Sequence, residues 1–229
     1  ATKVMQMLLT MSACLGSVMM PRASHLIAEN KEDEFSRLIQ KSYDFTLAIA
    51  LPMTIGLIFC APSLITALCG VKFEHSILPS QIIAPIILMV AISNVFGIQV
   101  LFPKGKINIV TLSCGIGAVA DLILNLCLIP FFSYIGTSIA YLGAEVATTV
   151  SMYFIGRKYI PIIYFKKSHL TYALGCIVMA FALYGLSLLQ LPTLTILLLQ
   201  GCCGVLAYFI ILCICKDEML VQILLKIKR

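Results

Sequence analysis

The sequence predicts an all-α integral membrane protein, a polytopic bundle of about seven transmembrane helices. Its 229 residues are 61% hydrophobic and 11% charged, and the mean hydropathy is +1.04. Soluble domains do not have such a composition. The apolar residues also fall into runs near the roughly 20 residues that a helix needs to span a bilayer. These runs are 4–20, 43–68, 77–102, 107–132, 134–155, 170–191 and 194–215.

The loops between these runs alternate between basic and nearly uncharged. The second loop holds only Lys72, and the fourth and sixth hold no basic residue. The positive-inside rule then places the basic loops and the C-terminus in the cytoplasm. This topology explains the net charge of +6, and the basic loops also attract anionic membrane lipids. We therefore expect no nucleic-acid partner. The basic loop and tail residues are Arg22, Lys31, Arg37, Lys41, Lys104, Lys106, Arg157, Lys158, Lys166, Lys167, Lys216, Lys226, Lys228 and Arg229.

The chain begins with Ala, and an apolar run follows almost at once without the features of a signal peptide. We therefore expect a fragment that begins within a transmembrane helix. The ten cysteines lie mostly inside apolar runs, without the spacing of metal ligands or a disulfide framework. We expect them to be packing residues, and we expect no metal and no cofactor.

One hairpin, residues 111–145, carries an acid in each of two apolar runs. An ionised carboxylate in hydrocarbon costs about 3 kcal/mol on insertion scales, so such acids face a protein interior, a partner or a water-filled cavity. Asp121 and Asn125 lie on one helical face, and Glu145 and Thr149 lie on a face of the next helix. Two interpretations remain open: the residues line a transport cavity, or Asp121 and Asn125 form a hydrogen-bonded pair that fixes helix packing.

Helix breakers and small residues add two further predictions. Pro21, Pro52, Gly56 and Pro85 interrupt the first three runs, where a transporter would place hinges and an ordinary span would have kinks. Small residues recur along one side of the fifth run, which predicts close approach of a neighbouring helix. The residues of this small stripe are Gly136, Ala140, Gly143 and Ala147.

Several motifs together resemble the O-antigen and capsular repeat-unit flippases of the multidrug/oligosaccharidyl-lipid/polysaccharide exporter superfamily. The strongest likeness is the stretch from Asn125 to Ala140, NLCLIPFFSYIGTSIA, followed by Glu145. Earlier motifs are P-x-x-S at Pro21 and Ser24, P-x-x-x-G-L at Pro52, Gly56 and Leu57, and Gly70 with Phe73.

The resemblance covers most of residues 1–158 and implies a fold of twelve or fourteen helices in two bundles around a central cavity. It implies that residues 1–158 belong to the C-terminal bundle. Residues 159–229 would then supply two additional helices and a basic cytoplasmic tail. The N-terminal half of the same chain would lie upstream.

The implied function is movement of an undecaprenyl-pyrophosphate-linked oligosaccharide across the bacterial inner membrane by alternating access. A pyrophosphate needs cationic or N–H donors, and the later spans contain no Arg or Lys well inside the bilayer. Arg22, Lys104 and Lys106 at the cytoplasmic rim are the candidate cations. Asp121 and Glu145 would then bind sugar hydroxyls or a coupling proton or sodium ion.

Two other functions compete with this one. A cation-coupled multidrug exporter of the same superfamily has the same fold, and buried acids suit cationic drugs. A membrane-embedded glycan polymerase or glycosyltransferase would need a substantial polar loop with acid/base residues. The outward loops are too short for that, so we expect a transporter with no catalytic residues and not an enzyme.

Overall fold

The computed structural model describes residues 19–163, 166–189 and 192–215, and these residues are almost entirely helical. A helix over 19–28 leads through a turn into the long helix α2 (Glu32–Cys69). The next span is built from four short pieces: η1 (Val71–Ser76), α3 (Ile77–Ile83), α4 (Ile86–Asn94) and η2 (Val95–Leu101). Three further helices follow, namely α5 (Ile107–Gly156), α6 (Lys167–Ser187) and α7 (Thr193–Ile214).

Five described helical stretches are long and apolar enough to cross a membrane. One of them, α5, folds back on itself at Ser133, where φ is 49° and ψ is −125°. Each half of α5 is about one membrane thickness long, and the halves coincide with the predicted runs 107–132 and 134–155. The described residues therefore contain six of the seven predicted spans, and the predicted run 4–20 lies almost wholly outside them.

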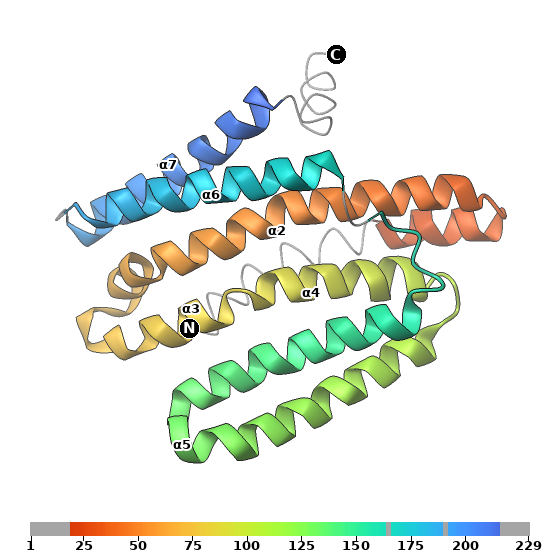
Figure 1. Cartoon of the computed structure of the whole chain (residues 1–229), viewed down its shortest axis with the longest axis horizontal. Coiled ribbons are helices and arrows are strands. Elements are labelled where there is room, and N and C mark those ends of the chain that lie inside the picture. The colour runs from red at the N-terminus through yellow and green to blue at the C-terminus, as the bar shows by residue number, and fades with distance from the viewer. Residues whose placement is uncertain (1–18, 164–165, 190–191, 216–229) are drawn as a thin grey trace.

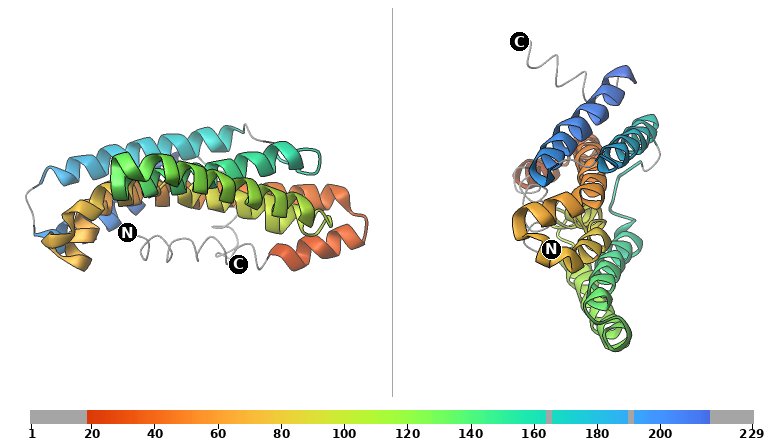
Figure 2. Two further views of the ribbon diagram at one scale, coloured as in Figure 1. Left: turned by 90° about the horizontal axis from the view of Figure 1, so that it is seen from below. Right: turned by 90° about the vertical axis from the view of Figure 1, so that its left-hand side faces the viewer.

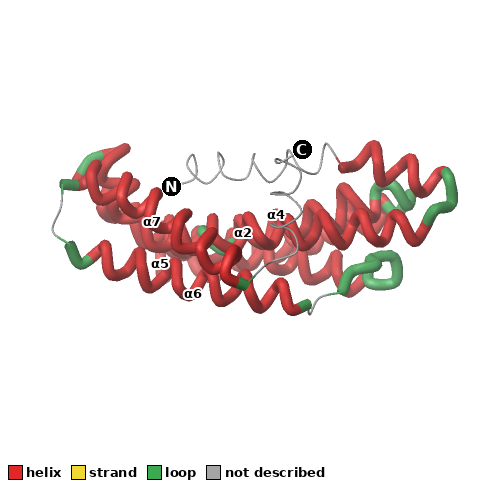
Figure 3. The backbone as a smooth tube through the Cα atoms, turned by 90° about the horizontal axis from the view of Figure 1, so that it is seen from above, coloured by secondary structure: helices red, strands yellow, loops and turns green. Residues whose placement is uncertain are grey.

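The elements form an elongated bundle with α2 and α4 in its middle (Figure 1). The folded helix α5 packs on α3, α4 and η2 at one edge, and α6 and α7 pack on α2 at the opposite edge (Figure 2). Loops gather at the two ends of the bundle (Figure 3). Both termini of α5 lie at the same end, so the basic loops 102–106 and 157–166 share that end, as the alternating charges predict. Which end faces the cytoplasm stays a prediction.

The two prolines inside α2 do not break it. A proline lacks the N–H that would bond the carbonyl four residues earlier, so Pro52 frees the carbonyl of Ala48 and Pro62 frees that of Ile58. The Tyr208 hydroxyl donates to the Ala48 oxygen at 2.8 Å, and Gln81 Nε2 donates to the Ile58 oxygen at 2.9 Å. Side chains from two other spans thus satisfy both freed carbonyls.

The hinge candidates therefore differ in local structure. Pro52 and Gly56 lie within continuous helix, and a Cβ on Gly56 would contact Met179 Cε at 3.3 Å. Pro85 stands where the α-helical hydrogen bonding is interrupted, since α3 ends at Ile83 and α4 starts at Ile86, although the Pro85 backbone stays in the helical region. Pro21 lies near the start of the described residues, in the helix over 19–28. Motion about any of them stays a prediction.

The third span ends in a π-helix, η2, which the sequence analysis did not anticipate. Its wider turn is closed by bonds such as that from the Phe102 N–H to the Gly97 oxygen at 2.9 Å. The Gln99 side chain is almost fully buried there and accepts a hydrogen bond of 2.5 Å from the Ser42 hydroxyl of α2. π-Helical turns occur often at functional sites, and this one lies at the end of the bundle with the basic loops.

Candidate functional site

The two halves of α5 approach each other closely through glycines. A Cβ placed on Gly136 would lie 2.6 Å from the Leu128 backbone oxygen, and one on Gly143 would lie 2.5 Å from Leu124 Cδ1. A Cβ on Gly117 would overlap the Thr148 hydroxyl. The predicted small stripe is thus confirmed, and its partner is the first half of the same helix. This tight packing sets the relative depth of the acids on the two halves.

Asp121 and Asn125 form the hydrogen-bonded pair that one interpretation of the sequence expected. Asn125 Nδ2 donates to Asp121 Oδ1 at 3.0 Å and to the Asp121 backbone oxygen at 2.9 Å. The other amide atom, Asn125 Oδ1, is buried and has no hydrogen-bond partner among the described residues. The pair is therefore only partly satisfied.

Leu124 lies against Gly143, and Gly117 lies against Thr148, so Asp121 and Glu145 lie between these two contacts at a similar level on the two halves of α5. This meets the expectation that the two acids share a depth in the hairpin. Thr149, one turn further, donates to the Glu145 backbone oxygen at 2.8 Å and lies 3.2 Å from the Met89 backbone oxygen of α4. Thr149 is thus a contact between α5 and α4.

A groove of about 630 Å³ lies beside Thr149, between α4 and the second half of α5. Its other lining residues are apolar or aromatic, and they include Met89, Phe96 and Tyr153. The hairpin acids and Asn125 do not line this groove. The hairpin therefore brings the two acids together at a place outside the groove, and of the four polar candidates only Thr149 reaches it.

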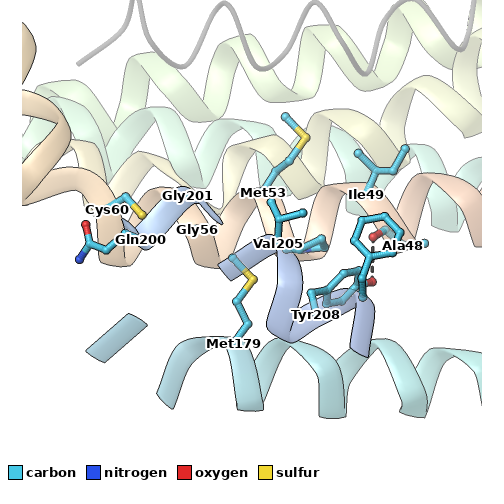
Figure 4. A pocket seen from close by; sticks show the side chains of 12 residues that line it. Ala48, Ile49, Met53, Gly56, Cys60, Met179, Gln200, Gly201, Val205 and Tyr208 are labelled. Carbon is cyan, nitrogen blue, oxygen red and sulfur yellow. Dashed lines mark hydrogen bonds between the residues drawn. The ribbon is translucent and has the colours of Figure 1, made fainter. Parts of the chain in front are cut away.

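A second cavity of about 350 Å³ lies between α2, α6 and α7 (Figure 4). Its walls are apolar, and Pro52 and Gly56 of α2 are among them. Gln200 of α7 lies at one end beside Cys60, and Tyr208 lies near the other end with its bond to Ala48. We call this cavity the α2–α6–α7 pocket.

The Gln200 side chain carries an unusual polar group into this pocket. Gln200 is 1% exposed, and neither atom of its carboxamide has a hydrogen-bond partner among the described residues. A buried polar group without a partner costs about 1–3 kcal/mol. Sequence analysis missed Gln200 because a single polar residue in an apolar run has no periodic signal.

The candidate rim cations lie at the end of the bundle that carries the basic loops. Lys104 Nζ lies 5.0 Å from the centre of the Phe35 ring, and Lys106 Nζ lies 5.1 Å from the centre of the Tyr159 ring. Arg22 is exposed. Both lysines are partly exposed, and cation–π contacts hold their side chains in place.

Sequence analysis also missed a charged cluster formed around Asp44. Asp44 is buried on α2 and pairs with Lys166 and His169 near the start of α6, each at 3.0 Å. More than 120 residues separate Asp44 from these partners, so only the tertiary structure could reveal the cluster. No group of three or more His, Cys, Asp or Glu side chains in the described ranges could hold a metal ion.

Comparisons with known proteins identify relatives of this chain. The family model described as "MurJ: Lipid II flippase MurJ" matches residues 1–202. A solved structure, "Lipid II flippase MurJ, inward closed conformation", has the same fold with a TM-score of 0.80 and 16% identity, over 96% of this chain and 46% of that one. The chain is also 29% identical over 141 residues to "Uncharacterized membrane protein MJ1068" from Methanocaldococcus jannaschii, which is 62% of this chain and 26% of that protein.

These comparisons refine the resemblance found in the sequence. They agree with the superfamily but point to its lipid II flippases, and they lend no support to the O-antigen or capsular assignment. The match covers about half of the solved relative, and the 141 aligned residues cover about a quarter of the archaeal protein.

Proposed function

We propose that this chain, which belongs to the lipid II flippase MurJ family, forms one helical half of a transporter that moves a lipid-linked oligosaccharide across a membrane. The observation that carries the proposal is the family match, which extends over residues 1–202. The family is one of transporters and not of enzymes. Alternating access by two bundles is the mechanism that the superfamily resemblance implies.

Lipid II is the substrate that the family name favours over an O-antigen or capsular repeat unit. All of these substrates share an oligosaccharide, a pyrophosphate and a polyprenyl chain, so the motifs that resemble O-antigen flippases fit either substrate. The shared chemistry demands sugar-binding polar groups, cations for the pyrophosphate and an apolar surface for the lipid.

The chain offers candidates for the cations and for the apolar surface. Lys104 and Lys106, with Arg22, are the cations that would meet the pyrophosphate at the cytoplasmic rim. The apolar α2–α6–α7 pocket is a surface on which the lipid could lie. Further cations would come from the other half of the transporter.

We assign the coupling role to the hairpin acids Asp121 and Glu145, with Asn125 beside them. The support is their similar level on the two closely packed halves of an apolar hairpin and the Asn125 Oδ1 atom, which has no hydrogen-bond partner among the described residues. Two carboxylates that desolvate together favour binding of a cation, either a proton or sodium. The cavity they serve would form against the other half of the transporter.

The domain arrangement follows the superfamily resemblance. Residues 1–158 would form the C-terminal bundle, and residues 159–229 would form the additional helix pair with its basic tail. The separate placement of α6 and α7 at one edge of the bundle agrees with this division.

The protein is a multi-pass membrane protein. Because one relative is archaeal, we propose that the protein lies in a prokaryotic cytoplasmic membrane, of which the bacterial inner membrane is one example.

The proposal is tested by complementation in a bacterial strain whose lipid II flippase can be depleted. The chain is expressed alone and together with the N-terminal half of a MurJ flippase, and lipid II on the outer leaflet is measured with a membrane-impermeant probe. We expect activity only with both halves. Activity of the chain alone would contradict the proposal that it is one of two halves. If every combination is inactive although membrane abundance is normal, lipid II is not the substrate.

The acids are tested in the active combination. Asp121→Asn and Glu145→Gln should each lower outer-leaflet lipid II at least about tenfold while membrane abundance stays normal. Normal transport in both variants would exclude the acids from coupling. Loss of abundance would make them structural residues of the hairpin.

A further inference from the structure

Within the part of the chain that the structure describes, the helix pair α6–α7 packs on the bundle mainly through α2. Its main contacts are within the pair and with α2, and α5 lies at the opposite edge (Figures 1 and 2). Between membrane helices, apolar packing gains little over contact with lipid tails, which are equally apolar. Directional polar contacts therefore act together with close van der Waals packing to fix where such a pair lies.

The strongest of these polar contacts surrounds Asp44. Asp44 Oδ2 accepts a hydrogen bond from Lys166 Nζ at 3.0 Å. Asp44 Oδ1 accepts one from Gln40 Nε2 at 2.7 Å and lies 3.0 Å from His169 Nε2. The Asp44 side chain is 10% exposed, that of His169 12% and that of Lys166 33%. A carboxylate this deeply buried is stable only with such partners.

Gln40 extends the cluster to the segment that leads into α6. The Ile163 N–H donates to Gln40 Oε1 at 2.7 Å, and Gln40 Nε2 lies 3.4 Å from the Ile163 oxygen. The rings of Tyr43 and Tyr172 flank the His169 ring, with centres 5.8 and 6.2 Å away. Gln40 and Asp44, one helical turn apart on α2, thus bind the segment that leads into α6 and the start of α6 itself.

We infer that Asp44, Lys166 and His169 form a latch that fixes the α6–α7 pair on α2 and so sets the width of the α2–α6–α7 pocket. Ala48, one helical turn after Asp44, lines that pocket and accepts the Tyr208 hydrogen bond. The latch therefore lies directly beyond one end of the pocket. When the latch opens, α6 and its connecting segment lose their polar attachment to α2, and the pocket widens from that end.

The test is amide hydrogen exchange of the chain in lipid nanodiscs, followed by mass spectrometry. The reporter is the peptide that covers 157–163, whose Ile163 amide bonds to Gln40. Asp44→Asn and Lys166→Met should raise its exchange rate at least about tenfold. Lys158→Met, which removes an exposed cation of the same segment, should leave the rate unchanged.

A charge swap separates a latch from general destabilisation. Asp44→Lys combined with Lys166→Asp should return most of the lost protection, because the ion pair is restored in reverse. Unchanged exchange in both single variants would overturn the latch. An equal rise in the unrelated loop 102–106, or no recovery in the swap, would also overturn it.

The effect on the pocket has its own readout. Cys60 lines the pocket, whereas Cys114 lies exposed on α5. In Lys166→Met, alkylation of Cys60 by a small maleimide should become at least about threefold faster relative to Cys114, since an opened latch exposes the pocket. An unchanged ratio would mean that the latch holds the connecting segment but does not control the pocket.

Discussion

The folded helix α5 and the pair α6–α7 are both helical hairpins at an edge of the bundle, yet different forces position them. Glycines bring the halves of α5 together so closely that a Cβ on Gly136 would meet backbone at 2.6 Å. The α6–α7 pair instead depends on side-chain hydrogen bonds to α2, from Lys166 and His169 to Asp44 and from Tyr208 to Ala48.

The acids at these two places differ in a similar way: Asp44 is the α2 acid that contacts α6, and Asp121 lies within α5. Asp44 is surrounded by three donors, two of which carry or can carry positive charge. Asp121 has the Asn125 amide as its neighbour, and a second carboxylate, Glu145, lies at a similar level on the facing half of α5. A fully partnered carboxylate holds structure together, whereas an acid beside another acid is available to bind a cation.

The largest expected effect is on stability at Asp44. Asp44→Ala leaves Lys166 and His169 without their acceptor and should lower the free energy of unfolding by about 3 kcal/mol. Asp121→Ala should lower it by less than about 1 kcal/mol, because that change also relieves repulsion with Glu145. The expected difference in melting temperature is about 5–10 °C.

Thermal unfolding in detergent can be followed with a thiol-reactive dye, since the chain has ten cysteines. Equal melting temperatures for the two alanine variants would show that Asp44 and Asp121 do not differ as structural and functional acids. A larger drop in melting temperature for Asp121→Ala would make Asp121 the structural acid.

The next effect concerns close packing in α5. Gly136→Ala should cost about 2 kcal/mol, because the new methyl group meets the Leu128 backbone, which cannot move aside as a side chain could. Gly115→Ala is the matched control, since nothing lies within 4 Å of a Cβ there. It should be neutral or stabilise the helix by up to about 1 kcal/mol. If both variants melt at the same temperature, the halves of α5 do not approach as described.

Gln200 gives a prediction of opposite sign. Gln200→Leu removes two buried polar atoms that have no partner among the described residues, so it should stabilise the protein by about 1–2 kcal/mol. Gln81→Leu, the control, removes the donor to the Ile58 oxygen and should destabilise it. Both are measured by the same melting assay. A destabilising Gln200→Leu would indicate that the carboxamide has a partner in the membrane.

The smallest effect tests the carbonyl freed by Pro52. Tyr208→Phe removes the hydroxyl that donates to the Ala48 oxygen and should cost about 1 kcal/mol. In a Pro52→Ala background, the new N–H can bond that oxygen, so Tyr208→Phe should cost less than about 0.5 kcal/mol. Equal costs in the two backgrounds would show that the Tyr208 hydroxyl does not compensate for the proline.

The sequence predicted the hairpin site more fully than its surroundings. The spans 107–132 and 134–155 match the two halves of α5, and the small stripe and the Asp121–Asn125 pair are both present. These features are local, since each depends on helical spacing or on a short turn between neighbouring helices. The resemblance also led to the right superfamily, and the family match points to its lipid II flippases.

The sequence by itself determined that the chain is a helical membrane protein, because the cost of burying polar backbone in hydrocarbon leaves long apolar runs few alternatives. Only the tertiary structure decided which polar side chains meet. Asp44 contacts Lys166 and His169, which are more than 120 residues away in the sequence. Tyr208 binds the carbonyl freed by Pro52, which is still further away in the sequence. Such contacts leave no periodic pattern, since they depend on which helix packs beside which, and that follows from the packing of the whole bundle.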